Sequence, residues 1–241
     1  MVARLKLISN PIPWSLVIKT VVLGGIWYFL PFPIFLVLAL YFYLVPMFKP
    51  SELAAPYFVT LILAFFLQTS FWAAVFVAVS MYLILGAKDL IFINRKAVYE
   101  TIVLILIFVM FLYFFLGLGS WFGISSILWS VMLALFIYIL FKGFLGYEGV
   151  LSEELTVEAK GHKFLVLGLS SFLVWQLTWV LVFLPIGSIY QTAVAFLVSV
   201  ILLELVLVYF SRSLTTRKIL MNFTLFFILL VLILTSTRWE L

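Results

Sequence analysis

The stretch from Tyr190 to Lys218 shows the pattern that most constrains how this chain can fold. An apolar run contains a single acidic residue, Glu204, and ends at a short basic link, SRSLTTRK. A second apolar run over residues 219–234 follows at once. Apolar runs of this length are typical of helices that cross a bilayer. The pattern predicts two membrane-spanning helices joined by a basic turn, and it repeats along the chain.

The composition indicates the same class of protein. Hydrophobic residues make up 67% of the 241 residues, and charged residues make up only 10%. Soluble domains are about half apolar and about a quarter charged, so this chain lacks the polar surface that a water-soluble globule needs. We therefore expect an all-α polytopic integral membrane helix bundle that forms a single transmembrane domain over residues 1–241.

The sequence predicts about nine short transmembrane helices. At about 1.5 Å per residue, one helix through either of the first two apolar runs would overshoot a bilayer core of about 30 Å. The prolines in Leu30–Pro33 divide the first run into helices at 15–30 and 33–48, because proline removes a backbone donor and forces the preceding residue into an extended conformation. The polar residues Gln68–Ser70 divide the second run, 53–85. If either division fails, the chain has seven or eight spans.

The rest of the chain contains five further apolar runs. We expect these spans at about 97–116, 121–141, 164–184, 190–210 and 219–234. Residues 143–163 form the only sizeable polar segment, which we interpret as a short polar cytoplasmic loop.

The lysine and arginine residues predict the orientation. With nine spans, the N-terminus and every second link lie on one face, which holds all of the 14 lysine and arginine residues except Arg238. Positive charge accumulates on the cytoplasmic side of membrane proteins. We therefore expect a bacterial plasma membrane protein whose N-terminus is cytoplasmic and whose C-terminus is outside.

Glu204 is the sharpest single candidate for a binding site. It lies about seven residues, or roughly 10 Å, from the cytoplasmic end of its helix, where a carboxylate is costly unless it is protonated, paired or facing water. Lys19, about five residues into the first span, lies at a similar depth and is the best candidate partner. The functional interpretation is a proton-binding or cation-binding site. The alternative, which we favour, is a structural Lys–Glu pair or a neutral glutamate that bonds two helices.

The span 164–184 carries a second candidate. Ser171, Trp175 and Thr178 follow helical spacing on one face, and Gln176 lies close to the middle of the span. Together with Trp179 they form a candidate lining for a small polar cavity that binds a substrate. The alternative, which we favour, is packing in which hydroxyl and amide groups bond across helices. Gly24 and Gly25 allow another helix to approach closely.

Several kinds of chemistry have little support in the sequence. The chain has no cysteine and a single histidine, His162, so thiolate catalysis and paired-histidine metal sites are excluded within one chain. We identify no catalytic constellation and expect no cofactor and no metal. The net charge of +5 comes from residues at helix ends, which indicates contact with anionic lipid and not with nucleic acid.

These observations favour a non-enzymatic structural or assembly component of a membrane. The alternative is a small transporter or permease subunit that uses Glu204, with Lys19 and the face of the span 164–184. A membrane-embedded lipid-modifying enzyme ranks third. The expected partners are the lipid bilayer and either further copies of the chain or other membrane subunits.

Overall fold

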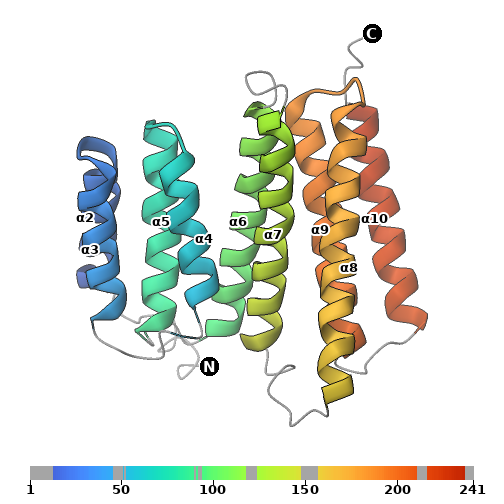
Figure 1. Cartoon of the computed structure of the whole chain (residues 1–241), viewed down its shortest axis with the longest axis horizontal. Helices are drawn as coiled ribbons and strands as arrows, with labels where there is room; N and C mark the ends of the chain where they lie inside the picture. The colour runs from blue at the N-terminus through green and yellow to red at the C-terminus, as the bar shows by residue number, and fades with distance from the viewer. Residues whose placement is uncertain are drawn as a thin grey trace, which may run out of the picture. The chain divides into compact units, whose positions relative to one another are not determined.

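The structure is a computed structural model, and its described parts are built from helices (Figure 1). The structure describes residues 13–45, 51, 53–89, 91, 94–117, 124–147, 157–210 and 216–236. Over these ranges it contains nine helices and no strand: α2 (Trp14–Phe29), α3 (Phe32–Leu44), α4 (Ala54–Phe66), α5 (Phe71–Lys88), α6 (Arg95–Gly117), α7 (Ile124–Tyr147), α8 (Val157–Val182), α9 (Ser188–Phe210) and α10 (Thr216–Ser236).

The helices confirm the predicted all-α membrane bundle. Five of them, α5 to α9, are long and apolar enough within the described residues to cross a membrane. α2, α3 and α4 are shorter apolar helices, and α10 contains a shorter apolar part at Phe223–Ser236. Many large apolar side chains point outward, including Phe29 at 80% exposure and Trp72 at 78%. An apolar outer surface of this extent is suited to lipid and not to water.

Both predicted helix divisions are confirmed. α2 ends at Phe29, Leu30 is extended, and Pro33 lies in the first turn of α3, where proline costs no intrahelical hydrogen bond. α4 ends at Phe66. The hydroxyl of Ser70 then accepts a hydrogen bond from the backbone N–H of Ala73, which starts α5 as an N-cap does.

The helices α7 and α8 both extend into the segment predicted as a polar loop at 143–163. α7 continues to Tyr147, and α8 already begins at Val157. The first turn of α8 contains Glu158, Ala159 and Lys160, which favour helix. A helix such as the end of α7 satisfies its own backbone groups in water as well as in lipid. The two helices can therefore extend beyond their apolar segments.

The chain divides into two compact units. One unit holds α2, α3, α5 and the part of α4 from Thr60 onward, up to Tyr99, and the other holds Ala54–Val59 and the chain from Glu100 onward. In the first unit α2 packs mainly on α5 and also on α3. In the second unit α8 packs on both α7 and α9, and α10 packs on α9.

Candidate functional site

The most strongly polar site that the structure describes is centred on Lys88, at the end of α5. Its side chain has no exposed surface, and its ammonium group donates to the carbonyl oxygens of Phe42 at 3.1 Å and Tyr43 at 2.7 Å. The same nitrogen lies 3.1 Å from a carboxylate oxygen of Asp89 and 5.7 Å from the centre of the Tyr43 ring. Lys88 therefore satisfies two carbonyls at the C-terminal end of α3, where the helix itself supplies no donor.

A tryptophan makes a similar bond at the end of α4. The indole N–H of Trp27, on α2, donates to the carbonyl oxygen of Ala64 at 2.9 Å, and both residues are buried. Ala64 lies in the last turn of α4. The indole thus satisfies a carbonyl that the end of the helix leaves without a partner.

A glutamine donates hydrogen bonds to carbonyl oxygens at the end of α8 and in the turn that follows it. The buried amide of Gln191, on α9, donates to the carbonyl oxygens of Leu181 at 2.8 Å and Leu184 at 3.3 Å. Leu181 lies in the last turn of α8, and Leu184 lies in the turn that connects α8 to α9. The side chain therefore fixes the turn and the two helices that it joins.

The contact between α2 and α5 is close because Gly24 has no side chain. A Cβ atom at Gly24 would lie 2.9 Å from the Cβ of Ala78 and 3.2 Å from the carbonyl oxygen of Ala74. Small residues at such spacing let membrane helices approach each other. At Gly25 a Cβ would meet nothing within 4 Å, so only the first of the two glycines makes the predicted close approach.

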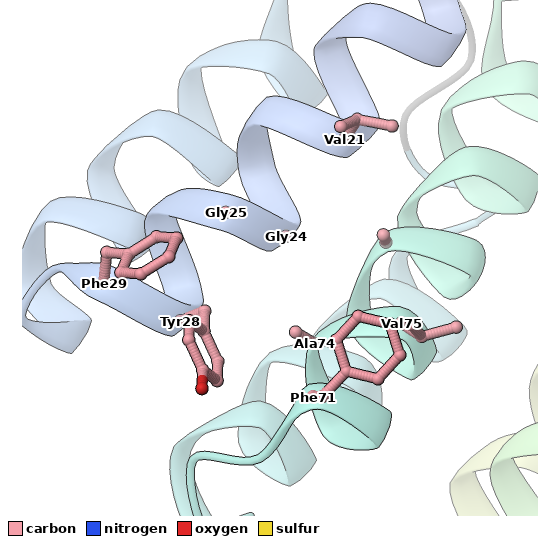
Figure 2. Close-up of a pocket in the computed structure, with 9 residues that line it drawn as sticks. Val21, Gly24, Gly25, Tyr28, Phe29, Phe71, Ala74 and Val75 are labelled. Carbon is pink, nitrogen blue, oxygen red and sulfur yellow. The ribbon is translucent and has the colours of Figure 1, made fainter.

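An apolar groove of about 410 Å³ lies beside this contact. Figure 2 shows the side chains of Tyr28 and Phe29 from α2 and of Phe71 and Val75 from α5 around it. Nearly all of its lining is carbon. The groove therefore suits an apolar group and offers little to orient a polar substrate.

Lys19 and Glu204 lie in different units. The ammonium group of Lys19 is half-buried and lies 5.9 Å from the centre of the Phe42 ring. Glu204 is exposed on α9. The pairing between them stays a prediction.

The structure separates the predicted site residues of α8. Ser171 and Thr178 are buried, and their hydroxyls donate to carbonyls of their own helix, those of Gly168 at 3.0 Å and Val174 at 2.8 Å. Gln176 is exposed. Serine and threonine often bond within their own helix in this way, so the two hydroxyls act locally.

Trp175 makes a bond between helices, whereas the packing alternative for this face expected such bonds from its hydroxyl and amide groups. Its indole N–H donates to the hydroxyl of Ser130, on α7, at 3.1 Å, and Ser130 donates to the carbonyl of Ile127 at 2.8 Å. An apolar groove of about 430 Å³ lies beside this bond and includes Ser171 in its lining. Whether this face binds a substrate stays a prediction.

The α8 and α9 helices meet again at the other end of their contact. A ring nitrogen of His162 lies 2.8 Å from the hydroxyl of Tyr209. The ammonium group of the next residue, Lys163, lies 5.6 Å from the centre of the Phe210 ring. These neighbouring contacts join the start of α8 to the end of α9. His162 is exposed to solvent, and it also makes a structural contact with α9.

Sequence reasoning missed Lys88, Trp27 and Gln191. None of the three stands out in the sequence, where Lys88 follows an apolar run and Trp27 lies inside one. A signal existed for Lys88, because a lysine at the C-terminal end of an apolar helix can reach the carbonyls of a neighbouring helix. No local signal identifies the neighbour whose carbonyls it reaches.

The described parts of the chain contain no group of three or more histidine, aspartate or glutamate side chains that could hold a metal ion. No protein-family model, curated protein or solved structure matches this chain.

Proposed function

We propose that this protein is a non-enzymatic structural component of a membrane, which acts by holding helices in a fixed arrangement. One observation carries the proposal. The buried polar groups Lys88, Trp27 and Gln191 all bond to backbone carbonyls at helix ends, and Trp175 bonds a neighbouring helix. Polar groups used in this way stabilise an arrangement of helices, whereas a transport path needs polar groups that face water or a substrate.

The two grooves described above support the same proposal. Their linings are almost entirely apolar. A binding site for a polar solute needs several convergent polar groups to set orientation and specificity. Lipid chains and apolar helix faces need none, so these grooves suit contacts within a membrane.

We further propose that the protein crosses the bacterial plasma membrane several times, with a cytoplasmic N-terminus and an external C-terminus. The distribution of lysine and arginine supports this orientation. Within the first unit, Lys19 and Lys88 both lie at the C-terminal end of α3. Cations that gather at one end of a helical unit favour the cytoplasmic side for that end.

The experiment is to extract the full chain from its native membrane into polymer nanodiscs and to measure the particle mass. A structural component is expected in a stoichiometric assembly heavier than one chain of 27.7 kDa with its lipid. The purified protein in proteoliposomes should conduct protons and alkali cations no faster than protein-free vesicles. Single chains in the native nanodiscs, together with a solute flux, would contradict the proposal.

Glu204 supports a second candidate function, transport. It is an exposed carboxylate inside an apolar helix, and ionisable residues within membranes often mark proton or ion paths. For a proton carrier, Glu204→Gln should keep expression and folding normal and abolish a proton flux in proteoliposomes. If Glu204→Gln and Glu204→Leu both behave as the unmodified protein does, transport through Glu204 is excluded.

A further inference from the structure

α3 is too short to cross a bilayer of ordinary thickness. It has 13 residues, which at about 1.5 Å per residue gives about 20 Å, whereas the hydrocarbon core is about 30 Å thick. Both of its ends are fixed, because Leu30 before it and Val45 after it have extended backbones. α4, also with 13 residues, has the same length.

The short helix is also exposed to lipid over its full length. All of its residues are apolar or aromatic. Side chains that recur every three or four residues form an exposed stripe from its first turn to its last, namely Ile34, Val37, Tyr41 and Leu44. Lipid therefore meets α3 directly and is not kept away from it by other helices of its unit.

A short helix constrains the bilayer in a way that a long helix does not. A long helix can project into water because its backbone groups are bonded internally. A short helix cannot end in hydrocarbon, since its last carbonyls and first N–H groups would lack partners there. The bilayer must then become thinner around the short helix, or the protein must satisfy the exposed ends itself.

The charged side chains locate one end of α3 at a headgroup region. Lys88 and Lys19 both lie at its C-terminal end, and Asp89 beside Lys88 is partly exposed. Lys88 itself has no exposed surface, but the half-buried Lys19 and the partly exposed Asp89 are favoured at the polar boundary over the hydrocarbon core. With that end fixed, the opposite end near Leu30 lies about 10 Å short of the headgroups of an undisturbed bilayer.

We propose that the leaflet at the Leu30 end is drawn inward around α2 and α3, so that phospholipid headgroups meet the Leu30–Pro33 turn. Exposed aromatic residues near this end, Tyr28 and Trp72, suit a boundary between water and hydrocarbon. The partner of this surface is therefore a locally thinned phospholipid leaflet. The inference goes beyond the structural role proposed above and does not depend on it.

The absence of cysteine permits a direct test with single nitroxide labels. Leu30→Cys and Val45→Cys place labels at the two ends of the α2–α3 pair, and Val37→Cys places one in the middle of α3. All three positions are exposed. In dioleoylphosphatidylcholine nanodiscs, a water-soluble nickel chelate should relax the Leu30 and Val45 labels several-fold more strongly than the Val37 label, and oxygen should show the reverse order.

The decisive result is the depth of the Leu30 label. Strong relaxation by the nickel chelate in both dimyristoleoyl and dioleoyl lipid supports the thinned leaflet. Relaxation only in the thin dimyristoleoyl bilayer, or in neither, overturns the proposal, because the turn then lies in hydrocarbon. Phe29→Cys, at a more exposed position, repeats the measurement if Leu30→Cys disturbs folding, and Ile189→Cys at the start of the long helix α9 provides the reference for a helix end at an ordinary boundary.

Discussion

The four N-terminal helices, α2 to α5, and the five C-terminal helices, α6 to α10, differ most in length. The N-terminal helices have 13 to 18 residues, and the C-terminal helices have 21 to 26. The short helices α3 and α4 both receive side-chain donors at their last carbonyls, from Lys88 and Trp27. Among the long helices, Trp175 and His162 instead make contacts along neighbouring helices.

This difference indicates that helix length determines whether the carbonyl groups at a helix end need polar side chains as hydrogen-bond donors. A helix that reaches water leaves its last carbonyls to the solvent, whereas a helix that ends early needs donors from the protein. The turn after α8 is an intermediate case, because Gln191 closes it although α8 is long. If the comparison is right, losing a donor at a short helix costs more stability than losing a similar contact between long helices.

The largest effect is expected for Lys88→Met. The substitution removes the ammonium group that donates to two carbonyls at the end of α3, and it leaves the carboxylate of Asp89 without the cation that lies 3.1 Å away. Removing one partner of a buried ion pair typically costs about 3–5 kcal/mol, and because Asp89 is partly exposed we expect the lower end of that range, about 3 kcal/mol. The free energy of unfolding should fall by that amount, as measured by equilibrium unfolding in mixed detergent micelles followed by tryptophan fluorescence.

Lys163→Met is the matched control among the long helices. Lys163 is only half-buried and lies over the Phe210 ring, so a loss of about 0.5–1 kcal/mol is expected. The double variant Lys88→Met/Asp89→Asn should regain part of the stability, because it also removes the remaining charge. Equal losses for Lys88→Met and Lys163→Met would contradict the comparison.

Gly24→Ala should have the next largest effect. The new methyl group would lie 2.9 Å from the Cβ of Ala78 and 3.2 Å from a backbone oxygen, and neither neighbour has a flexible side chain that can move aside. Overpacking of this kind costs about 1–3 kcal/mol. Gly25→Ala adds the same methyl group to the same helix in open space, so it should not destabilise. The thermal unfolding midpoints of the two variants in nanodiscs should therefore differ, and equal midpoints would show that α2 and α5 are not closely packed at Gly24.

Gln191→Leu should lower the free energy of unfolding by about 1–2 kcal/mol, because two carbonyls at the end of α8 lose a donor but keep backbone partners. Leu184 N–H still donates to Leu181, and Ile186 N–H still donates to Leu184. Gln176→Leu makes the same chemical change at an exposed position of α8 and should stay within about 0.5 kcal/mol of the unmodified protein. A larger loss for Gln176→Leu would indicate a polar partner for this amide and would favour the predicted substrate-binding site on α8.

The helical fold could be predicted from the sequence because its causes are local. Runs of apolar residues, the prolines of Leu30–Pro33 and the polar residues Gln68–Ser70 act on the chain within a few residues. Each of these features therefore determines where a helix runs or where it ends, whatever the helix packs against. The C-terminal end of α7 and the N-terminal end of α8 were less predictable, since a helix can continue past its apolar segment, at α7 even through Gly143 and Gly146.

The candidate site was less predictable because its bonds join distant parts of the chain. Lys88 bonds residues 45 and 46 positions earlier, and Trp27 bonds a carbonyl 37 positions later. The sequence identified polar residues in unusual places, such as Glu204. It gave no sign of backbone carbonyls as partners, because every residue carries one and only the packing decides which of them lacks a donor.

The smallest expected difference between the two groups of helices is tested with one kind of substitution, tryptophan to phenylalanine, made once in each group. Trp27→Phe keeps a buried ring but leaves the carbonyl of Ala64 without the indole donor at the end of a short helix, which should cost about 1–1.5 kcal/mol. Trp175→Phe removes a bond to Ser130, whose hydroxyl keeps its own acceptor at Ile127, so a loss of about 0.6 kcal/mol is expected. Both losses are measured by unfolding in mixed micelles followed by circular dichroism. The change in ring size and the lost N–H are the same in both variants, and Trp27 is the more deeply buried ring. A loss for Trp175→Phe as large as that for Trp27→Phe would therefore mean that helix length does not decide what a polar bond contributes.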